Sequence, residues 1–375
     1  MTFRRVLITG GAGFIGSHLA DALLAEGCTV RILDALVPQV HGPQRVWPAY
    51  LNSGAERLVG DVRDTGILKQ ALTDVETVVH FAAAVGVGQS MYEIAAYVAG
   101  NTQATANLLQ VLSEGEHTVR KLVVASSMSV YGEGAYCCAR CGPCMPPPRS
   151  PDRLESKQWE MACPTCGGNA QPVPTPEGKL LAPTSIYAIT KRDQEEMCLC
   201  VGQAYGIPTV ALRFFNVYGE RQALSNPYTG VAAIFSSRLL NDQPPLIYED
   251  GRQSRDFIHV SDIVQATLLA MQRPQADYQV FNVGTGHAIT VAEVAEVLAA
   301  SLQKRIAPQF LQTFRSGDIR HCVADITRIG KTLGYRPKVA FADGMSRLSA
   351  WIRNQRPYDR VVEANAHLQK RGLVG

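Results

Sequence analysis

The stretch RVLITGGAGFIGSHLADALLAEG, residues 5–27, decides the fold. It opens with an apolar, β-branched run that ends at glycine, which is the pattern of a buried strand. From Phe14 onward the apolar residues recur at helical spacing, so a helix follows the strand directly. Gly10, Gly13 and Gly16 therefore lie on a strand-to-helix turn. Glycines at such a turn allow a tight bend and let backbone N–H groups approach a pyrophosphate at the positive end of the helix.

The next predicted strand, TVRILD, ends at Asp34, 24 residues after Gly10. A carboxylate at this point accepts hydrogen bonds from both ribose hydroxyls and repels a 2′-phosphate. The glycine spacing, Gly-x-x-Gly-x-x-Gly, is a variant of the common dinucleotide fingerprint and is weak evidence alone. Together with Asp34 at the end of the second strand, it predicts a site for NAD in preference to NADP.

Strand-like and helix-like segments continue to alternate along the first two hundred residues. Apolar strand patterns lead into Asp61, into Ala82 and Ala83, and into Ser127, with helix-length segments between them. Such alternation is typical of an α/β protein with a doubly wound parallel sheet. In that architecture the loops at the carboxyl ends of the strands carry the ligand.

A tyrosine and a lysine stand four residues apart in PTSIYAITKRDQEEM, residues 183–197. This segment reads as a helix, so Tyr187 and Lys191 project from one face. A phenol with its ordinary pKa of about 10 needs help to act as a base near neutral pH. A nearby ammonium and a positively charged nicotinamide ring both favour the phenolate. The pair therefore predicts an acid–base centre beside the nucleotide.

The composition is that of an ordinary globular protein. Of 375 residues, 46% are hydrophobic and 18% are charged, which suits one large or two medium domains. The net charge of +3 is too weak to favour a nucleic acid or a membrane surface as a partner. We expect no leader peptide and no membrane span. The expected location is the cytoplasm, where ten cysteines would not form a disulfide framework.

Seven segments together resemble the extended short-chain dehydrogenase/reductases that act on nucleotide sugars. They are GGAGFIGSHL, HFAAAVG, SSMSVYG, YAITK, RFFNVYG, RDFIHVSDI and FNVGTG. The resemblance runs from about residue 3 to about residue 340 and implies an NAD-binding Rossmann domain with a smaller α/β domain for the nucleotide sugar. The implied parts are a Rossmann domain over 1–215 with a return at 253–284, a substrate domain over 216–252 and 285–350, and a tail over 351–375.

The resemblance also implies roles for individual residues. Ser127, four before Tyr131, resembles the hydroxyl that polarises the substrate oxygen. Tyr187 resembles the acid–base residue, and Lys191 the residue that lowers its pKa and holds the nicotinamide ribose. The further positions implied for NAD are Gly10, Gly13, Phe14, Ile15, Gly16, Asp34, Asp61, Val62, Phe81, Ala82, Ala83, Asn101 and Phe214. Those implied for a nucleotide-diphosphate sugar are Ser129, Asn216, Tyr248, Arg255 and Arg315, with an ion pair to Asp256 as the alternative role of Arg255.

The reaction type depends on the residues after Ser127. The 4,6-dehydratases of this family carry Asp-Glu there, whereas this chain has Met128 and Ser129, which cannot act as general acids near neutral pH. A 4-epimerase needs only Ser127, Tyr187 and Lys191 and is preferred to an NAD-using 4-ketoreductase or dehydrogenase. A non-catalytic NAD-responsive binding protein is disfavoured because Tyr187 and Lys191 are both present.

A narrower resemblance concerns the substrate and the assembly. The segment FAAAVGVGQSMYEI and the Cys-rich segment after VYGEG are similar to dTDP-L-rhamnose 4-epimerases, which interconvert dTDP-L-rhamnose and dTDP-6-deoxy-L-talose. A UDP-sugar 4-epimerase is the alternative. A homodimer is also expected, with residues 94–112 and the helix of Tyr187 forming a four-helix interface.

Residues 134–183 are an insertion that the basic fold does not need, rich in Pro and Cys and poor in periodicity. Two repeats, CARCG and CPTCG, supply Cys138, Cys141, Cys163 and Cys166, and 21 residues separate the pairs. This spacing predicts a structural zinc site with four thiolate ligands, closed to substrate. Cys137 and Cys144 would then be spare, although Cys141 with Cys144 is another possible first pair. Without a metal, these cysteines would be free thiols or, less favourably, form a disulfide.

Overall fold

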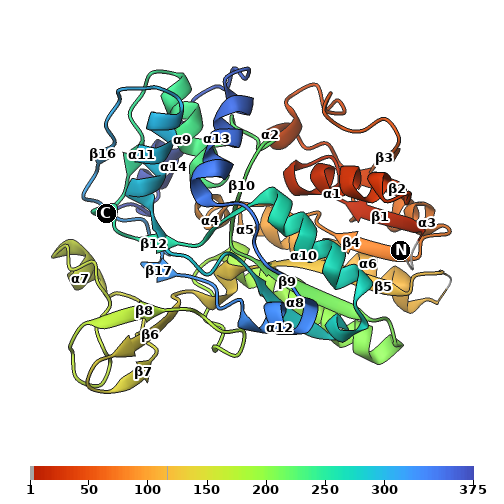
Figure 1. The fold of residues 1–375 in the computed structure, drawn as a ribbon, viewed down its shortest axis with the longest axis horizontal. Coiled ribbons are helices and arrows are strands. Elements are labelled where there is room, and N and C mark those ends of the chain that lie inside the picture. Colours follow the sequence, from red (N-terminus) through yellow and green to blue (C-terminus); the bar gives the residue numbers. More distant parts are fainter. Residues whose placement is uncertain (1–3, 116) are drawn as a thin grey trace.

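A computed structural model describes residues 4–115 and 117–375 of the protein, and its centre is a sheet of seven parallel strands (Figure 1). The strand order is β14-β9-β5-β4-β1-β2-β3. Strand β1 lies near the middle, and because its neighbours β2 and β4 run parallel to it, crossover connections join the strands. The doubly wound parallel sheet predicted from the alternating pattern is confirmed. In order across the sheet the strands are β14 (Gln279–Val283), β9 (Thr209–Phe214), β5 (Lys121–Ser127), β4 (Thr77–His80), β1 (Arg5–Thr9), β2 (Thr29–Asp34) and β3 (Glu56–Val59).

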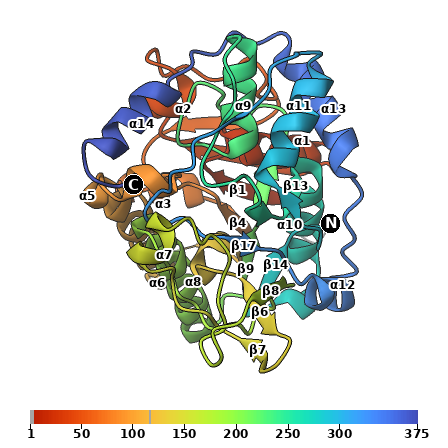
Figure 2. The same ribbon diagram turned by 90° about the vertical axis from the view of Figure 1, so that its left-hand side faces the viewer.

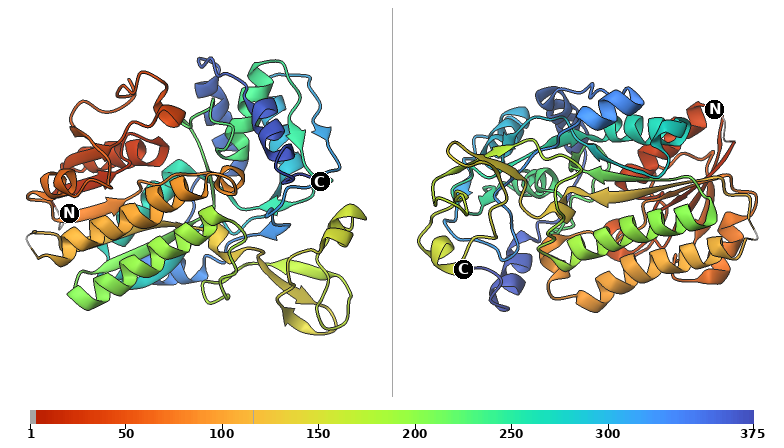
Figure 3. Two further views of the ribbon diagram at one scale, coloured as in Figure 1. Left: turned by 180° about the vertical axis from the view of Figure 1, so that it is seen from behind. Right: turned by 90° about the horizontal axis from the view of Figure 1, so that it is seen from below.

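Helices cover both faces of this sheet. The face seen from behind carries α3 (Thr65–Leu72), α6 (Ala104–Ser113) and α8 (Ile186–Tyr205) (Figure 3). The opposite face carries α1 (Phe14–Ala25), α10 (Val260–Gln272) and α12 (Thr327–Leu333). Alternate residues of β1 feed two apolar clusters, with Val6 and Ile8 in one and Leu7 in the other. Burial on both faces explains why the strand sequences are almost continuously apolar.

The helix predicted for residues 94–112 is long but not uniform. It consists of α5 (Ile94–Tyr97), a π-helical stretch η1 (Val98–Gln103) and then α6. The wider turn of η1 carries Asn101, whose buried side chain bonds both backbone groups of Ala84 in the loop after β4. Wide turns of this kind often occur beside functional sites.

A second group of elements lies beyond the carboxyl ends of the sheet strands (Figure 1). Its helices α9 (Val231–Leu240), α11 (Val291–Ser301) and α13 (Phe341–Ile352) pack around one apolar cluster. Short strands pair beside them, and chain segments far apart in sequence meet in these pairs. The pairs are β10 (Asn216–Tyr218) with β13 (Phe257–His259), β11 (Leu246–Ile247) with β16 (Gln309–Phe310), and β12 (Ser254–Arg255) with β15 (Ile289–Thr290) and β17 (His321–Cys322).

The Cys-rich insertion projects from the body beside β17 (Figures 1 and 2). It stays out of the main sheet, yet it forms a small antiparallel sheet of its own in the order β7-β6-β8. Its elements are β6 (Ala135–Cys138), β7 (Gly142–Cys144), α7 (Pro151–Glu155) and β8 (Ala170–Val173). These strands have three or four residues, too few for a periodic pattern to reveal them.

The remaining elements are four short helical segments in connections and one helix, α14, that follows α13. They are α2 (Pro38–His41), α4 (Val87–Ser90), η2 (Met128–Tyr131), η3 (Pro274–Ala276) and α14 (Val361–Gln369). Within residues 4–115 and 117–375, no helix is both long enough and apolar enough to cross a membrane.

The glycine turn after β1 should tolerate no side chain. A Cβ on Gly10 would lie 2.8 Å from the Ala82 nitrogen, and Gly10 has a φ of +70°. Gly27 has a similar φ of +79° but open space around it, so it isolates the backbone strain. Gly27→Ala should lower the free energy of unfolding by about 1–2 kcal/mol, and Gly10→Ala by a further ~1–3 kcal/mol. Equal losses in urea denaturation would contradict this account of the turn.

Candidate active site

One cavity of about 830 Å³ opens at the carboxyl ends of the sheet strands and continues between them and the second group of elements. This size falls in the range of small-molecule sites. Every residue predicted for catalysis or substrate binding lines it, and so does every predicted cofactor residue except Asn101. Asn101 is fully buried behind the wall, where its side chain holds Ala84 and Thr190. The structure therefore makes Asn101 a support of the cavity loop and not part of its surface.

The dinucleotide half of the cavity is formed by the turn after β1. A Cβ on Gly16 would lie 2.6 Å from the Gly10 oxygen. Only glycine at position 16 therefore allows the helix to approach the turn this closely. Gly13 begins α1 without a side-chain cap, which leaves the first N–H groups of the helix directed at the cavity. Both features fit a pyrophosphate at the positive helix end.

Asp34 lies at the end of β2 and is held firmly. Its carboxylate accepts hydrogen bonds from the backbone nitrogens of Ala12 at 3.0 Å and Leu36 at 2.9 Å. His41 from α2 approaches it at 3.6 Å, and burial lowers the pKa of this imidazole, so the histidine is neutral near pH 7. A carboxyl group held in this way, beside a neutral imidazole, fits two ribose hydroxyls better than a 2′-phosphate.

The predicted catalytic residues converge from two elements. Ser127 ends β5, and its Oγ accepts a hydrogen bond from Ser129 Oγ at 2.9 Å. Tyr187 and Lys191 come from the first turns of α8, which Ser185 caps. Lys191 is 4% exposed, and its Nζ donates to the Ala125 carbonyl of β5 at 2.9 Å. This bond fixes α8 against the strand that ends in Ser127.

Electrostatics differ from the sequence expectation in one respect. Burial raises the pKa of the Tyr187 phenol, and the hydrogen bond from Ser127 opposes that rise. Lys191 is not among the groups that lower it in this geometry. Burial also lowers the pKa of Lys191 to about 8. A phenol whose pKa lies above 10 is neutral near pH 7, so Tyr187 needs further positive charge nearby to act as a base.

A buried polar network supports β5 and α8 from behind. Arg213 and Glu195 form a two-pronged ion pair with contacts of 2.5 and 2.9 Å. Ser126, the neighbour of Ser127, donates its hydroxyl to the same carboxylate at 2.6 Å, and Arg213 donates to the Tyr131 hydroxyl at 2.8 Å. Because each charge has a partner, the network fixes the strand end without leaving an unpaired charge.

Two arginines line the substrate half, and they differ in the contacts that their guanidinium groups make. Arg255 donates to the backbone carbonyls of Ile319 at 2.6 Å and Arg320 at 2.9 Å. The alternative role as the ion-pair partner of Asp256 is wrong, because that carboxylate accepts hydrogen bonds from Thr285 and Gly286. Arg315 stacks on the Tyr248 ring at 4.8 Å.

Many residues that line the cavity escaped the sequence analysis. Among them are the three amides Gln222, Gln253 and Asn365, which line the substrate half. The buried side-chain oxygens of Gln222 and Gln253, like that of the predicted residue Asn216, have no hydrogen-bond partner within residues 4–115 and 117–375. Gln222 and Gln253 lie in irregular segments and Asn365 lies in α14, and no local sequence pattern marks any of them as a cavity residue.

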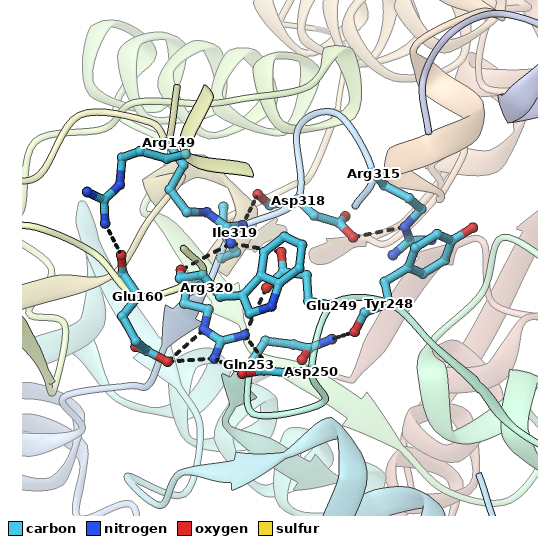
Figure 4. A network of polar contacts seen from close by, with 12 residues as sticks. Arg149, Glu160, Tyr248, Glu249, Asp250, Gln253, Arg315, Asp318, Ile319 and Arg320 are labelled. Atoms are coloured by element: carbon cyan, nitrogen blue, oxygen red, sulfur yellow. Dashed lines mark hydrogen bonds and ion pairs between the residues drawn. The ribbon is translucent and has the colours of Figure 1, made fainter. Parts of the chain in front are cut away.

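A cluster of charges joins the insertion to this half of the cavity (Figure 4). Arg320 is completely buried and contacts Glu160 of the insertion at 2.5 Å, Glu249 at 2.8 Å and Asp250 at 2.7 Å. Arg149, also from the insertion, pairs with Glu249 at 2.8 Å. Hydrogen bonding to His321, ahead of Arg320, lowers the pKa of Glu160 to about 2.

The four predicted zinc ligands meet in space. The sulfur atoms of Cys138, Cys141, Cys163 and Cys166 all lie within 4.8 Å of one another, and those of Cys138 and Cys166 are 3.6 Å apart. A tetrahedron with Zn–S bonds of ~2.3 Å has edges of about 3.8 Å, so the donor set fits. Backbone N–H groups of Cys166 and Thr165 lower the pKa of Cys163 to about 6. Cys137 and Cys144 are not part of this cluster.

The chain matches a known family over most of its length. The model of the NAD dependent epimerase/dehydratase family matches residues 6–151 and 164–284. The chain is 33% identical to dTDP-L-rhamnose 4-epimerase of Burkholderia thailandensis, over 93% of this chain and 95% of that protein.

Solved structures agree with this match. UDP-glucose 4-epimerase of Thermotoga maritima, solved with UDP-glucose, is 29% identical, with a TM-score of 0.75 over 93% of this chain and 98% of that chain. UDP-glucose 4-epimerase of Thermus thermophilus, solved with NAD, is also 29% identical, with a TM-score of 0.73 over 94% and 99% of the two chains.

The buried lysine should shape the pH dependence of stability. Its pKa falls from 10.5 to about 8 on folding, so between these values the unfolded chain holds a proton that the folded protein has released. The free energy of unfolding therefore rises with pH in this window. Lys191→Met should remove roughly 3 kcal/mol of that rise.

Urea denaturation at several pH values measures the effect. Lys331→Met, at an exposed lysine of α12, is the control and should keep the rise of the unmodified protein. The same rise in Lys191→Met would contradict the burial account.

Proposed function

Because this chain belongs to the NAD-dependent epimerase/dehydratase family, we propose that it is a nucleotide-sugar 4-epimerase whose substrate pair is dTDP-L-rhamnose and dTDP-6-deoxy-L-talose. The observation that carries the proposal is the meeting of Ser127, Tyr187 and Lys191 in one cavity, with Met128 and Ser129 in place of acidic residues. A dehydratase would need a carboxyl group at that point to move protons during loss of water.

The proposed chemistry needs few groups from the protein. As a phenolate, which the positive charges of Lys191 and of bound NAD would favour, Tyr187 takes the proton from the 4-hydroxyl as a hydride leaves carbon 4, which gives a 4-keto sugar. Ser127 donates a hydrogen bond to the same oxygen. The 4-keto sugar then rotates within the cavity. The hydride returns to the opposite face of carbon 4, and Tyr187 gives the proton back to the oxygen. Bound NAD supplies the acceptor and then the donor of the hydride.

Lys191 and Asp34 have separate proposed roles in the cofactor site. The ammonium of Lys191, already fixed by the Ala125 carbonyl, contributes positive charge near the phenol and binds the nicotinamide ribose. Asp34 accepts hydrogen bonds from the adenosine ribose and selects NAD. The close glycine turn and the uncapped start of α1 support this assignment.

The sugar nucleotide is the less constrained part of the proposal. The Burkholderia relative supports dTDP-L-rhamnose. The Thermotoga structure with UDP-glucose supports a UDP sugar as the second candidate. In either case we propose that Arg315, Arg255 and Asn216 bind the sugar diphosphate, because guanidinium groups pair well with phosphate oxygens.

We also propose a homodimer that buries part of the helices on one face of the sheet. Ile94 and Val98 of the α5–η1 segment are 50% and 42% exposed, and Ile189 of the neighbouring α8 is 42% exposed. Large apolar side chains in such a position suit a four-helix interface between two copies.

For the insertion we propose one structural zinc ion bound by Cys138, Cys141, Cys163 and Cys166. Four thiolates fill the coordination sphere, so the metal would stabilise the fold of the insertion and take no part in the sugar chemistry. The charge cluster around Arg320 supports a link to the substrate. This cluster fixes residues 319–320, whose backbone carbonyls accept hydrogen bonds from Arg255 of the substrate half.

A substrate screen tests the proposed activity. The purified protein, incubated with single dTDP and UDP sugars, should convert dTDP-L-rhamnose into a product that NMR identifies as the 4-epimer. Conversion of a UDP sugar alone would replace the dTDP assignment, and loss of water from the sugar would overturn epimerisation.

Tyr187→Phe should lower turnover at least ~100-fold, because the phenol must exchange a proton with the 4-hydroxyl. The variant should keep its bound NAD and its fold, since the ring remains. Tyr205→Phe, at an exposed tyrosine in the last turn of α8, is a matched control and should turn over normally. Near-native turnover in Tyr187→Phe would refute its role.

Cys163→Ser should release the proposed zinc. Elemental analysis of protein purified without a chelator should give one zinc per chain in the unmodified protein and much less in the variant. Cys200→Ser, at an exposed cysteine of α8, should keep the metal. Substrate affinity should fall more than NAD affinity in Cys163→Ser. Unmodified protein without zinc would contradict the metal assignment.

A further inference from the structure

Residues 357–375 lie across the substrate half of the cavity and are anchored at three places. Four of them, Val361, Ala364, Asn365 and Leu368, line the cavity wall. The sequence analysis treated this segment as part of a tail. Its contacts instead join the second group of elements to the loops of the parallel sheet, and we refer to residues 357–375 as the strap.

The first anchor is at the end of α9. Asp359 forms an ion pair with Arg238 at 2.9 Å, and both side chains are largely buried. Asn241 donates its side-chain nitrogen to the Pro357 carbonyl at 3.0 Å. The backbone nitrogen of Tyr358 donates to Ser225 Oγ at 3.1 Å. These contacts fix the start of α14.

The middle anchor is on the other side of the cavity, beside α4. The buried side chain of Leu368 packs near Gly88, where a Cβ would lie 3.6 Å from it. The Arg371 guanidinium stacks on the Tyr92 ring at 4.4 Å. The strap therefore bridges from the second group of elements to the loop that follows β4.

The last anchor is a short backbone pairing next to Arg315. Phe314 and Gly375 exchange two hydrogen bonds of 2.9 and 3.1 Å, and the Ser316 nitrogen donates to the Leu373 carbonyl at 2.9 Å. Arg315 itself pairs with Val374 in this antiparallel bridge. The strap thus fixes the backbone that carries a proposed diphosphate ligand.

One side chain of the strap, Asn365, is linked to that arginine through Tyr248. The Tyr248 hydroxyl donates to Asn365 Oδ1 at 2.9 Å, and the Arg315 guanidinium stacks on the Tyr248 ring at 4.8 Å. Arg315 Nε donates to Asp318 at 2.8 Å (Figure 4). The Nη groups of Arg315 have no hydrogen bond to any residue in the ranges that the structure describes, so they remain available to a ligand in the cavity.

We propose that the strap is part of the nucleotide-sugar site and that Asn365 is a positioning residue, acting through Tyr248 to hold Arg315 toward the diphosphate. This inference rests on the proposed nucleotide-sugar substrate. Asn365 touches no reacting atom in this account. It sets the orientation of the ring on which the arginine rests, which favours one direction for the guanidinium before the ligand binds.

The test compares the binding of dTDP and of UDP, titrated separately by calorimetry into the NAD-loaded protein. Asn365→Leu removes the acceptor and keeps the number and branching of the side-chain heavy atoms, and Tyr248→Phe removes the donor while it keeps the ring under Arg315. Each should weaken binding of the preferred nucleotide ~5–10-fold, the usual size of one lost hydrogen bond. The double variant should lose no more than either single variant, because both changes remove one interaction.

Three readouts separate positioning from a general loss of structure. In both variants KM for the sugar should rise with the nucleotide Kd, while kcat changes less than about twofold and NAD affinity stays constant. Gln369→Leu, at an exposed residue of the same helix, should leave every value unchanged. If Asn365→Leu and Tyr248→Phe bind the nucleotide as tightly as the unmodified protein does, the inference is wrong but the proposed substrate is not affected. Failure of the unmodified protein to bind either nucleotide would overturn the proposed substrate and the inference together.

Discussion

The single direction of the seven sheet strands is the constraint on which the site depends. Parallel strands all end at one edge, so the glycine turn after β1, Asp34 after β2 and Ser127 after β5 meet there although the chain separates them widely. Helix α8 adds Tyr187 and Lys191 from the face of the sheet. The bond from Lys191 to the Ala125 carbonyl joins helix and strand, so the relative position of phenol and serine follows from sheet packing.

The parts that sequence reasoning found are those with local patterns. Runs of buried strand residues, helical spacing and two Cys-x-x-Cys pairs are readable from neighbours in the chain, and they predicted the sheet and the sulfur cluster. The parts that it missed depend on distant segments. Arg320 and its partners Glu160 and Glu249 come from three such segments, and the pairing of Leu373–Gly375 with residues 314–316 joins two more. Asn101 shows a further limit, because a family resemblance cannot tell a side chain that lines a cavity from one that supports its wall.

The two halves of the cavity differ in how they are supported. The dinucleotide half depends on backbone turns and on the main sheet. The substrate half receives contacts from two additions to the sheet. The insertion reaches Arg255 through Arg320, and the strap reaches Arg315 through Tyr248. The substrate half therefore depends on segments that lie outside the main sheet.

The most direct test of epimerisation through a 4-keto sugar follows the hydrogen on carbon 4. dTDP-L-rhamnose labelled with deuterium at carbon 4 is incubated with the protein in ordinary water, without added nicotinamide nucleotide, and both sugars are examined by NMR and mass spectrometry. If the hydride leaves and returns within one cavity, the 4-epimer should retain the deuterium at carbon 4. Formation of the 4-epimer with loss of deuterium to water, or release of a stable keto sugar as the main product, would contradict the account.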